Sequence, residues 1–157
     1  MTLPAQLQAA YSGSAAGIRD FNTKGGLQYT TSDVSIDIDI DDFYTGAGVK
    51  GQVTNRKVFD LNGVDVTAEV AEEASTGAKT LPRAVFTVGP GVLAASGDVV
   101  GEITSTFTAA DGSTTAYEAG NYYAVVSGAN ANKIVGVFVL EANSARETSG
   151  FIVYREP

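Results

Sequence analysis

The sequence predicts an all-β protein, an antiparallel β-barrel of about eight or more strands, with a β-sandwich as the alternative. Three observations predict it: apolar residues recur at every second position, turn pairs separate these segments, and glycines fall inside the strand patterns. The 157 residues include 18 glycines and are rich in Val, Thr, Ala and Ser, a composition typical of strands and turns. The length suits a single domain over residues 1–157.

Period-two alternation is clearest over residues 33–43, 64–70 and 134–140. In the first segment a Val/Ile face alternates with an aspartate-rich face, which is typical of a half-buried strand. Ala68–Ala74 is the one helix candidate, and it overlaps the second segment. We expect the following side chains to be mostly buried: Ile36, Ile38, Ile40, Val64, Val66, Ile103, Phe107, Ile134, Phe138 and Leu140.

Turn chemistry separates the strand segments. Asn62-Gly63 and Asp111-Gly112 predict tight hairpins, and Gly128–Asn132 marks another turn. Roughly nine to eleven segments result, as in a sandwich or barrel. Glycines within strands favour the barrel, because they relieve crowding where strands bend sharply. In a closed sheet the last segment, Gly150–Arg155, pairs with Ile134–Leu140 and with Leu7–Ala15.

Composition excludes several classes of function. The chain has no histidine and no cysteine, so the commonest general base, metal ligands and nucleophile pairs are missing. We expect no catalytic residues, no metal site, no cofactor and no enzyme activity. The net charge of −8 disfavours nucleic acid and anionic lipid as partners, and no apolar run is long enough for membrane insertion as a helix. The first six residues lack signal-peptide features; a removed leader and a protein that is never exported both remain open.

Four aspartates form the densest charge cluster. A calcium site is the first interpretation, but carboxylates along one strand diverge too far to share an ion. We therefore favour a solvated outer face whose cross-strand partners are basic residues. The aspartates are Asp37, Asp39, Asp41 and Asp42, and the candidate partners are Lys50, Arg56 and Lys57.

The last third of the chain carries a family resemblance. Residues 120–138 read Gly-Asn-Tyr-Tyr-Ala-Val-Val-Ser-Gly-Ala-Asn-Ala-Asn-Lys-Ile-Val-Gly-Val-Phe, and residues 149–155 read Ser-Gly-Phe-Ile-Val-Tyr-Arg. They resemble the closing hairpins in the barrel domain of transferrin-binding protein B and related bacterial surface lipoproteins and haemophores. Alanine stands where a proline follows Gly128 in that family, Lys133 replaces a common glutamate, and the lipid-bearing cysteine is missing. The resemblance implies an eight-stranded barrel and a non-catalytic binding module, and it transfers no ligand residues.

The candidate interaction surface combines two adjacent tyrosines with the loop that follows them. On a strand one tyrosine faces inward and the other outward, and an exposed tyrosine is a good interface anchor. The residues are Tyr122, Tyr123, Gly128, Asn130 and Asn132, and the loop at Gly25-Gly26 is a further possible contact.

We expect a non-enzymatic binding module at the bacterial surface or secreted, which recognises a protein partner. The alternative is a structural subunit of a virion, tail or surface filament that self-assembles.

Overall fold

The computed structural model describes residues 8–39, 48–87 and 93–157. Its elements are β1 (Gln8–Phe21), β2 (Leu27–Asp39), β3 (Val49–Phe59), α1 (Thr67–Ala74), β4 (Ala84–Phe86), β5 (Asp98–Thr108), β6 (Thr114–Ser127), a 3₁₀ turn (Ala129–Ala131), β7 (Lys133–Glu141) and β8 (Ala145–Arg155).

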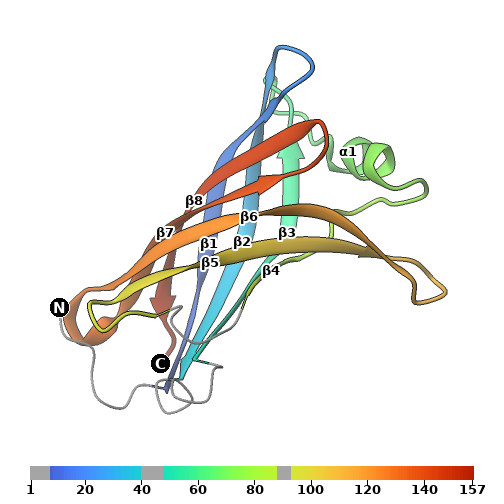
Figure 1. The fold of residues 1–157 in the computed structure, drawn as a ribbon. Coiled ribbons are helices and arrows are strands. Elements are labelled where there is room, and N and C mark those ends of the chain that lie inside the picture. The colour runs from blue at the N-terminus through green and yellow to red at the C-terminus, as the bar shows by residue number, and fades with distance from the viewer. Residues whose placement is uncertain (1–7, 40–47, 88–92) are drawn as a thin grey trace.

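The sheet is a closed eight-stranded antiparallel barrel. Each strand pairs with the next along the chain, and β8 returns to pair with β1 (Figure 1). The register sets Gly150 of β8 opposite Val137 of β7 and Ala16 of β1. The predicted barrel and the predicted pairing of the closing strand are therefore confirmed, and the sandwich alternative is wrong.

Side chains point alternately into and out of the barrel along each strand, and those that point inward are mostly apolar. Six of the expected core residues are buried, namely Ile36, Ile38, Ile103, Ile134, Phe138 and Leu140. Phe107 and Val66 are half-buried. Val64 is 57% exposed, so the prediction that it is buried is wrong. Ile40 lies outside the described residues.

Three glycines make room for aromatic rings inside the barrel. Gly51, Gly101 and Gly136 lie opposite Phe86, Tyr122 and Phe151 on the neighbouring strands. A Cβ at any of the three would lie 2.0–2.8 Å from an atom of the facing aromatic side chain. The rings pack together, with centroids 4.5 Å apart for Phe86–Tyr122 and 6.1 Å apart for Phe86–Phe151. Glycine here is the cross-strand partner that lets a large ring lie flat across a curved sheet.

The segment after β3 leaves the sheet instead of forming the expected strand over 64–70. Gly63 adopts a positive φ of 82°, as its turn requires, but only one bridge, Phe59 to Asp65, follows. The Asp65 carboxylate then accepts a hydrogen bond from the backbone N–H of Thr67 at 2.9 Å, the first residue of α1. The prediction of a strand after the Asn62-Gly63 turn is therefore wrong, and the helix candidate at Ala68–Ala74 is confirmed. The Asp111-Gly112 turn does join two strands, β5 and β6.

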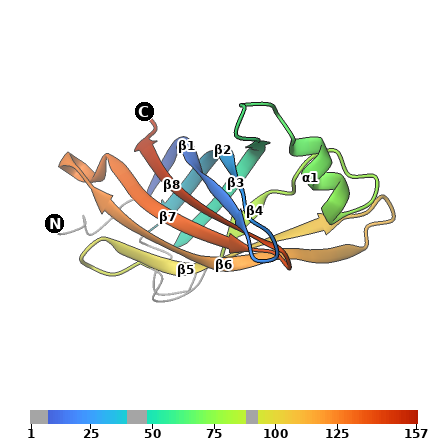
Figure 2. The same ribbon diagram turned by 90° about the horizontal axis from the view of Figure 1, so that it is seen from above.

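Helix α1 lies beside β3, on the opposite side of the barrel from β7 and β8 (Figures 1 and 2). The strand β4 has only three residues and pairs with Gly51–Val53 of β3. The rest of β3 therefore lacks a neighbouring strand on that side. The remainder of β3, toward Phe59, is met by α1 and its connections. Thr67 accepts a hydrogen bond from the backbone N–H of Val58 at 2.9 Å.

The aspartate face of β2 points outward, as expected. Asp37 is exposed and lies opposite Lys50 of β3, and Lys57 forms an ion pair with Asp65 at 4.0 Å. Among the described residues no group of three acidic, histidine or cysteine side chains is placed to hold a metal ion. Asp41 and Asp42 lie outside the described residues.

Candidate interaction surface and a buried ionic cluster

The two adjacent tyrosines point in opposite directions, as the strand pattern predicts. Tyr122 is 3% exposed and packs among the interior rings, while Tyr123 is 47% exposed. Burial raises the pKa of Tyr122 to about 12. Tyr122 is therefore a core residue and cannot serve on the expected interaction surface, whereas Tyr123 remains available there.

Tyr123 is held in place at the outer surface of β6. Its hydroxyl donates a hydrogen bond to the Asp98 carboxylate at 2.7 Å, and Ser96 donates a second bond to the same side chain. Both bonds lower the pKa of Asp98, and the bond from Ser96 has the larger effect. A ring fixed by its own hydroxyl loses little conformational entropy on binding.

Three groups fasten the loop over 128–132 to the barrel end by hydrogen bonds. Its backbone has positive φ at Gly128 (81°), Asn130 (57°) and Ala131 (55°). The buried hydroxyl of Tyr11 donates to the Ala131 carbonyl at 2.7 Å. Arg155 donates through its guanidinium to the Asn130 carbonyl at 3.3 Å and through its backbone N–H to the Asn132 carbonyl at 2.9 Å.

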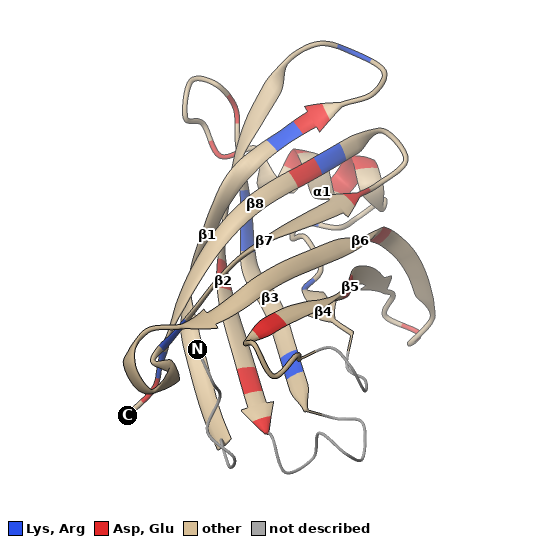
Figure 3. Ribbon diagram, turned by 60° about the vertical axis from the view of Figure 1, so that its left-hand side comes forward, with Lys and Arg blue, Asp and Glu red and all other residues tan. Residues whose placement is uncertain are grey.

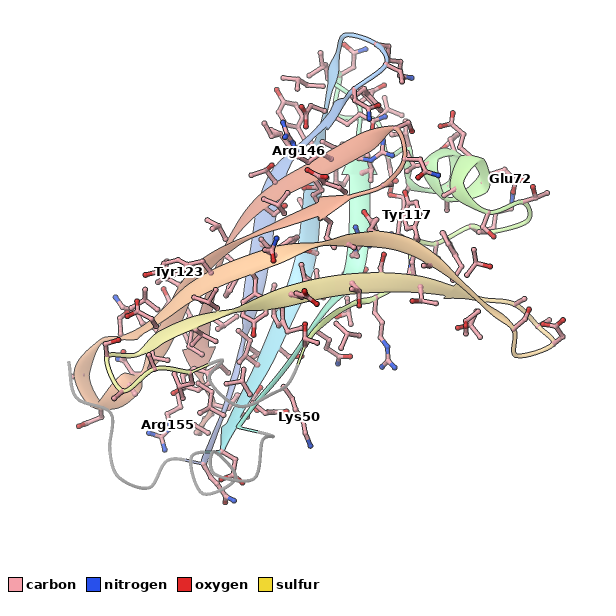
Figure 4. The ribbon with its side chains drawn as sticks, in the orientation of Figure 1. Lys50, Glu72, Tyr117, Tyr123, Arg146 and Arg155 are labelled. Carbon is pink, nitrogen blue, oxygen red and sulfur yellow. The ribbon has the colours of Figure 1, made fainter. Side chains whose placement is uncertain are left out.

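The loop presents its polar side chains to solvent. Gly128, Asn130 and Asn132 are exposed, while Ala131 is completely buried and plugs the barrel end. Tyr123 and Arg155 lie at the same end of the molecule (Figure 4). The structure thus brings the loop and Tyr123 to one end of the barrel; whether they form an interface is still a prediction.

An uncharged outer face runs from this end across β6, β7, β8 and β1. The outward side chains of β7 and β8 are uncharged from Val135 to Val139 and from Thr148 to Tyr154, and Figure 3 shows charge on these two strands only near their ends. Exposed large side chains on and beside this face are Ile18 (43%), Val100 (53%), Tyr123 (47%), Val135 (43%), Val137 (50%) and Tyr154 (56%). In a chain with net charge −8, an apolar field of this kind is a candidate contact surface.

Sequence reasoning missed a buried ionic cluster inside the barrel, near α1. The guanidinium of Arg56 on β3 donates to both carboxylate oxygens of Glu118 on β6, at 2.7 and 3.0 Å. It also lies 3.5 Å from a carboxylate oxygen of Glu147 on β8. All three side chains are at most 6% exposed. Arg56 is therefore not a surface partner of the β2 aspartates, and that expectation was wrong.

One β-bulge turns Arg56 of this cluster inward. Between Thr31 and Asp33 the β2–β3 register gains one residue on β3, and Asn55 at this point has φ 49°. The extra residue inverts the alternation, so Arg56 points into the barrel although Val49 and Val53 also do. A second register shift in the β5–β6 pair immediately precedes Glu118. The only sequence signal for the first bulge is an asparagine, a residue that tolerates positive φ.

The electrostatics of the cluster are those of one cation shared by two carboxylates. Burial raises the pKa of Glu147, and the charge of Glu118 adds to the increase, against the lowering effect of Arg56. Burial acts to lower the pKa of Arg56, but the hydrogen bond and charge of Glu118 outweigh it and leave that pKa raised. Glu118 also accepts a hydrogen bond from Ser105 at 2.7 Å. The cluster positions side chains within the barrel and does not open onto the uncharged outer face.

A hollow of about 240 Å³ on the described surface is lined by Asp20, Glu141 and Arg146 among others, and two more lie around β3. One, of about 500 Å³, lies between β3, α1 and residues 79–81, with Arg56 in its wall. The other, of about 310 Å³, lies over β2, β3 and β4 and is lined by Lys50 and Arg83 among others. None of the three lies beside Tyr123 or the loop over 128–132.

The fold defines a class: an eight-stranded antiparallel barrel like those of transferrin-binding protein B. The chain is similar to the vaccine antigen transferrin-binding protein B of Haemophilus parasuis Hp5, in a mutant form, at 13% identity and a TM-score of 0.50. It is also similar to isotype 1 transferrin-binding protein B of serogroup B Neisseria meningitidis, at 14% identity and a TM-score of 0.50. The matches cover 98% and 99% of this chain but only 27% and 26% of those proteins.

At these identities the likeness shows the fold alone, and it confirms the expected resemblance at that level. No family model matches the chain, and no curated protein matches it in sequence. Among the described residues, no helix is long and apolar enough to cross a membrane.

Proposed function

We propose that this barrel is a non-enzymatic module that binds a protein partner through its uncharged outer face, at the cell surface or after secretion. One observation carries the proposal: large exposed apolar and aromatic side chains lie along one outer face that carries no charge, on a barrel that is acidic as a whole. Protein contact surfaces are depleted of charge at their centre and enriched in tyrosine.

Two features of this face suit binding better than catalysis. Tyr123 and the loop over 128–132 are both held by hydrogen bonds, so little order has to be gained on contact. Glu147, the carboxylate whose pKa burial raises, is in the barrel interior and lies 3.5 Å from the Arg56 guanidinium. The fold neighbours support the same class of function, because both are named as transferrin-binding proteins. We transfer a protein ligand to this chain and not transferrin itself.

The test compares tyrosines of matched exposure. The purified chain is immobilised and offered extracellular proteins from its source, alongside the double variant Tyr123→Ala/Tyr154→Ala and the control Tyr29→Ala. Tyr29 is 49% exposed and lies on β2, which β1 separates from β8. We expect wild type and Tyr29→Ala to retain the same protein, and the double variant to lose affinity on the order of thirty-fold, as for two interface anchors.

Equal retention by all three forms would place the contact elsewhere and contradict the proposed surface. Steady turnover of any substrate by the wild-type chain would contradict the non-enzymatic function.

A further inference from the structure

We infer that the partner which fits the centre of the uncharged face is a second copy of this chain, seated along β7 and β8. This inference rests on the proposed function, because it names the occupant of the same face. It comes from the order of the outward side chains on these two strands.

The two strands carry complementary residues at every register. Outward on β7 are Lys133, Val135, Val137, Val139 and Glu141, and their cross-strand partners on β8 are Tyr154, Ile152, Gly150, Thr148 and Arg146. Each pair would also make a favourable contact if its members came from different molecules. Glu141 would meet a guanidinium, Lys133 an aromatic ring, and Val135 and Val139 an aliphatic and a methyl-bearing side chain.

We place the two-fold axis of the dimer between β7 and β8 and parallel to them, because this axis forms the same favourable pairs between two molecules. Such an axis places each β7 side chain over the second copy's version of its own cross-strand neighbour. The contact is then isologous, meaning that residue i meets residue j and j meets i, as a symmetric dimer requires. Glu141 of one copy faces Arg146 of the other, whose guanidinium also bonds Asp20 of its own chain at 3.2 Å, and this contact forms twice.

The centre of the strip fits in shape as well as in charge. Val137 projects from β7 and is 50% exposed. Beside it Gly150 leaves bare backbone, because a Cβ added there meets only the carbonyl oxygen of Gly136, at 3.9 Å. On the proposed axis the Val137 side chain of one copy enters the space above Gly150 of the other. An axis perpendicular to the strands would instead stack glycine on glycine and leave a gap.

Charge favours this strip over other parts of the surface. Each copy has a net charge of −8, so two copies repel each other, and this repulsion is least where the contact area itself carries no charge. The aspartate face of β2 cannot provide one, whereas β7 and β8 carry charges of both signs at their ends and none between. Arg146 lies at one end of β8 and Arg155 at the other (Figure 4).

The convex outer surface of a barrel limits the size of the contact. A strip about 30 Å long and two to three strands wide buries roughly 900 Å² in total, less than the ~1,200 Å² of standard stable interfaces. We therefore expect a weak dimer that exchanges with monomer, with a dissociation constant in the micromolar range or above.

Sedimentation of the whole chain over about 1 µM to 1 mM tests the inference. We expect a reversible monomer–dimer equilibrium. Val137→Lys should weaken it more than roughly ten-fold, because two charges would be buried without partners. Val85→Lys is the matched control, since Val85 is 42% exposed on β4 and lies outside the strip; it should leave the equilibrium unchanged. Thermal melting confirms that each variant is folded.

A charge exchange tests the axis. Arg146→Glu or Glu141→Arg alone sets like charges against each other and should weaken the dimer, while the double exchange should restore it. Under the perpendicular axis the double exchange would not restore it, because an arginine at 141 would then face Lys133.

The two proposals fail in different ways. A chain that stays monomeric up to 1 mM, or a dimer indifferent to Val137→Lys, overturns the self-association. If the monomeric chain still captures a protein in a Tyr123- and Tyr154-dependent manner, the proposed function stands without it. If the chain neither dimerises nor captures a protein, both are wrong.

Discussion

The interior charges near α1 are the residues whose energies depend most on their surroundings. Glu118 holds the guanidinium of Arg56 through two short hydrogen bonds, while Glu147 approaches it at 3.5 Å. A buried charge is expensive unless it is paired. The second carboxylate is therefore the group that the fold tolerates least in its ionised form.

The raised pKa of Glu147 sets the sign of a pH effect. The folded state binds this proton more tightly than the unfolded state does. The corresponding stability is complete below the ordinary pKa of 4.5 and is lost as pH rises through the raised value. We expect Glu147→Gln to remove this loss, so the unfolding free energy of wild type relative to the variant should fall as pH rises from about 4.5 toward neutrality. Urea titrations across that range measure the difference.

Glu118→Gln is the matched comparison, because it changes the carboxylate that carries the close contacts. It should destabilise the protein at neutral pH by about 3–5 kcal/mol, the usual cost of breaking a buried ion pair. If both variants lost the same stability at neutral pH, the two carboxylates would be equivalent partners and the assignment would be wrong.

At the scale of elements, the bulge in β3 decides what enters the barrel. Asn55 has φ 49° and its side chain donates to the Asp33 carboxylate at 3.2 Å. The bulge switches the inward set of β3 from the odd to the even positions, and this change brings Arg56 inside. The strand is thus apolar inside near β4 and carries a cation inside near α1.

Substitutions at Asn55 test this conformation. Asn55→Gly should change the unfolding free energy by less than about 1 kcal/mol, because glycine adopts positive φ freely. Asn55→Val should cost about 1–2 kcal/mol or more, because a β-branched side chain is strained in the left-handed region. The difference in unfolding free energy is measured from denaturant midpoints with unchanged slopes. Equal stability of the two variants would contradict the bulge.

At the scale of the whole molecule, β8 closes the barrel. It pairs with β7 on one side and β1 on the other, and it supplies Phe151 and Val153 to the core. Closure removes sheet edges that would otherwise recruit other chains.

Deleting the residues after Ser149 should therefore unfold or aggregate the protein and not simply fray its end. The truncation removes two interior side chains and leaves residues 133–137 of β7 and 11–16 of β1 without their β8 partners. Light scattering and thermal melting distinguish the outcomes. A soluble truncation with a cooperative melt would show that closure by β8 is dispensable.

The sequence by itself determined the all-β class, the β5–β6 hairpin and most of the core. Isoleucines at every second position of β2 and the Asp111-Gly112 pair act through local geometry, which a pattern can reveal. The opposite directions of Tyr122 and Tyr123 follow from the same period. The resemblance of the last third predicted the closing hairpins.

The local strand and turn patterns did not predict the exposure of Val64, the burial of Arg56 or the uncharged outer face; these depend on the tertiary structure. Val64 continues an alternating pattern, yet the chain leaves the sheet there, because α1 and not another strand covers the gap beside the three-residue β4. Arg56 enters the core because one extra residue inverts a period of two, and strand periodicity does not reveal a bulge. The uncharged outer face also depends on closure, since β1, β8, β7 and β6 form one surface only when the last strand meets the first.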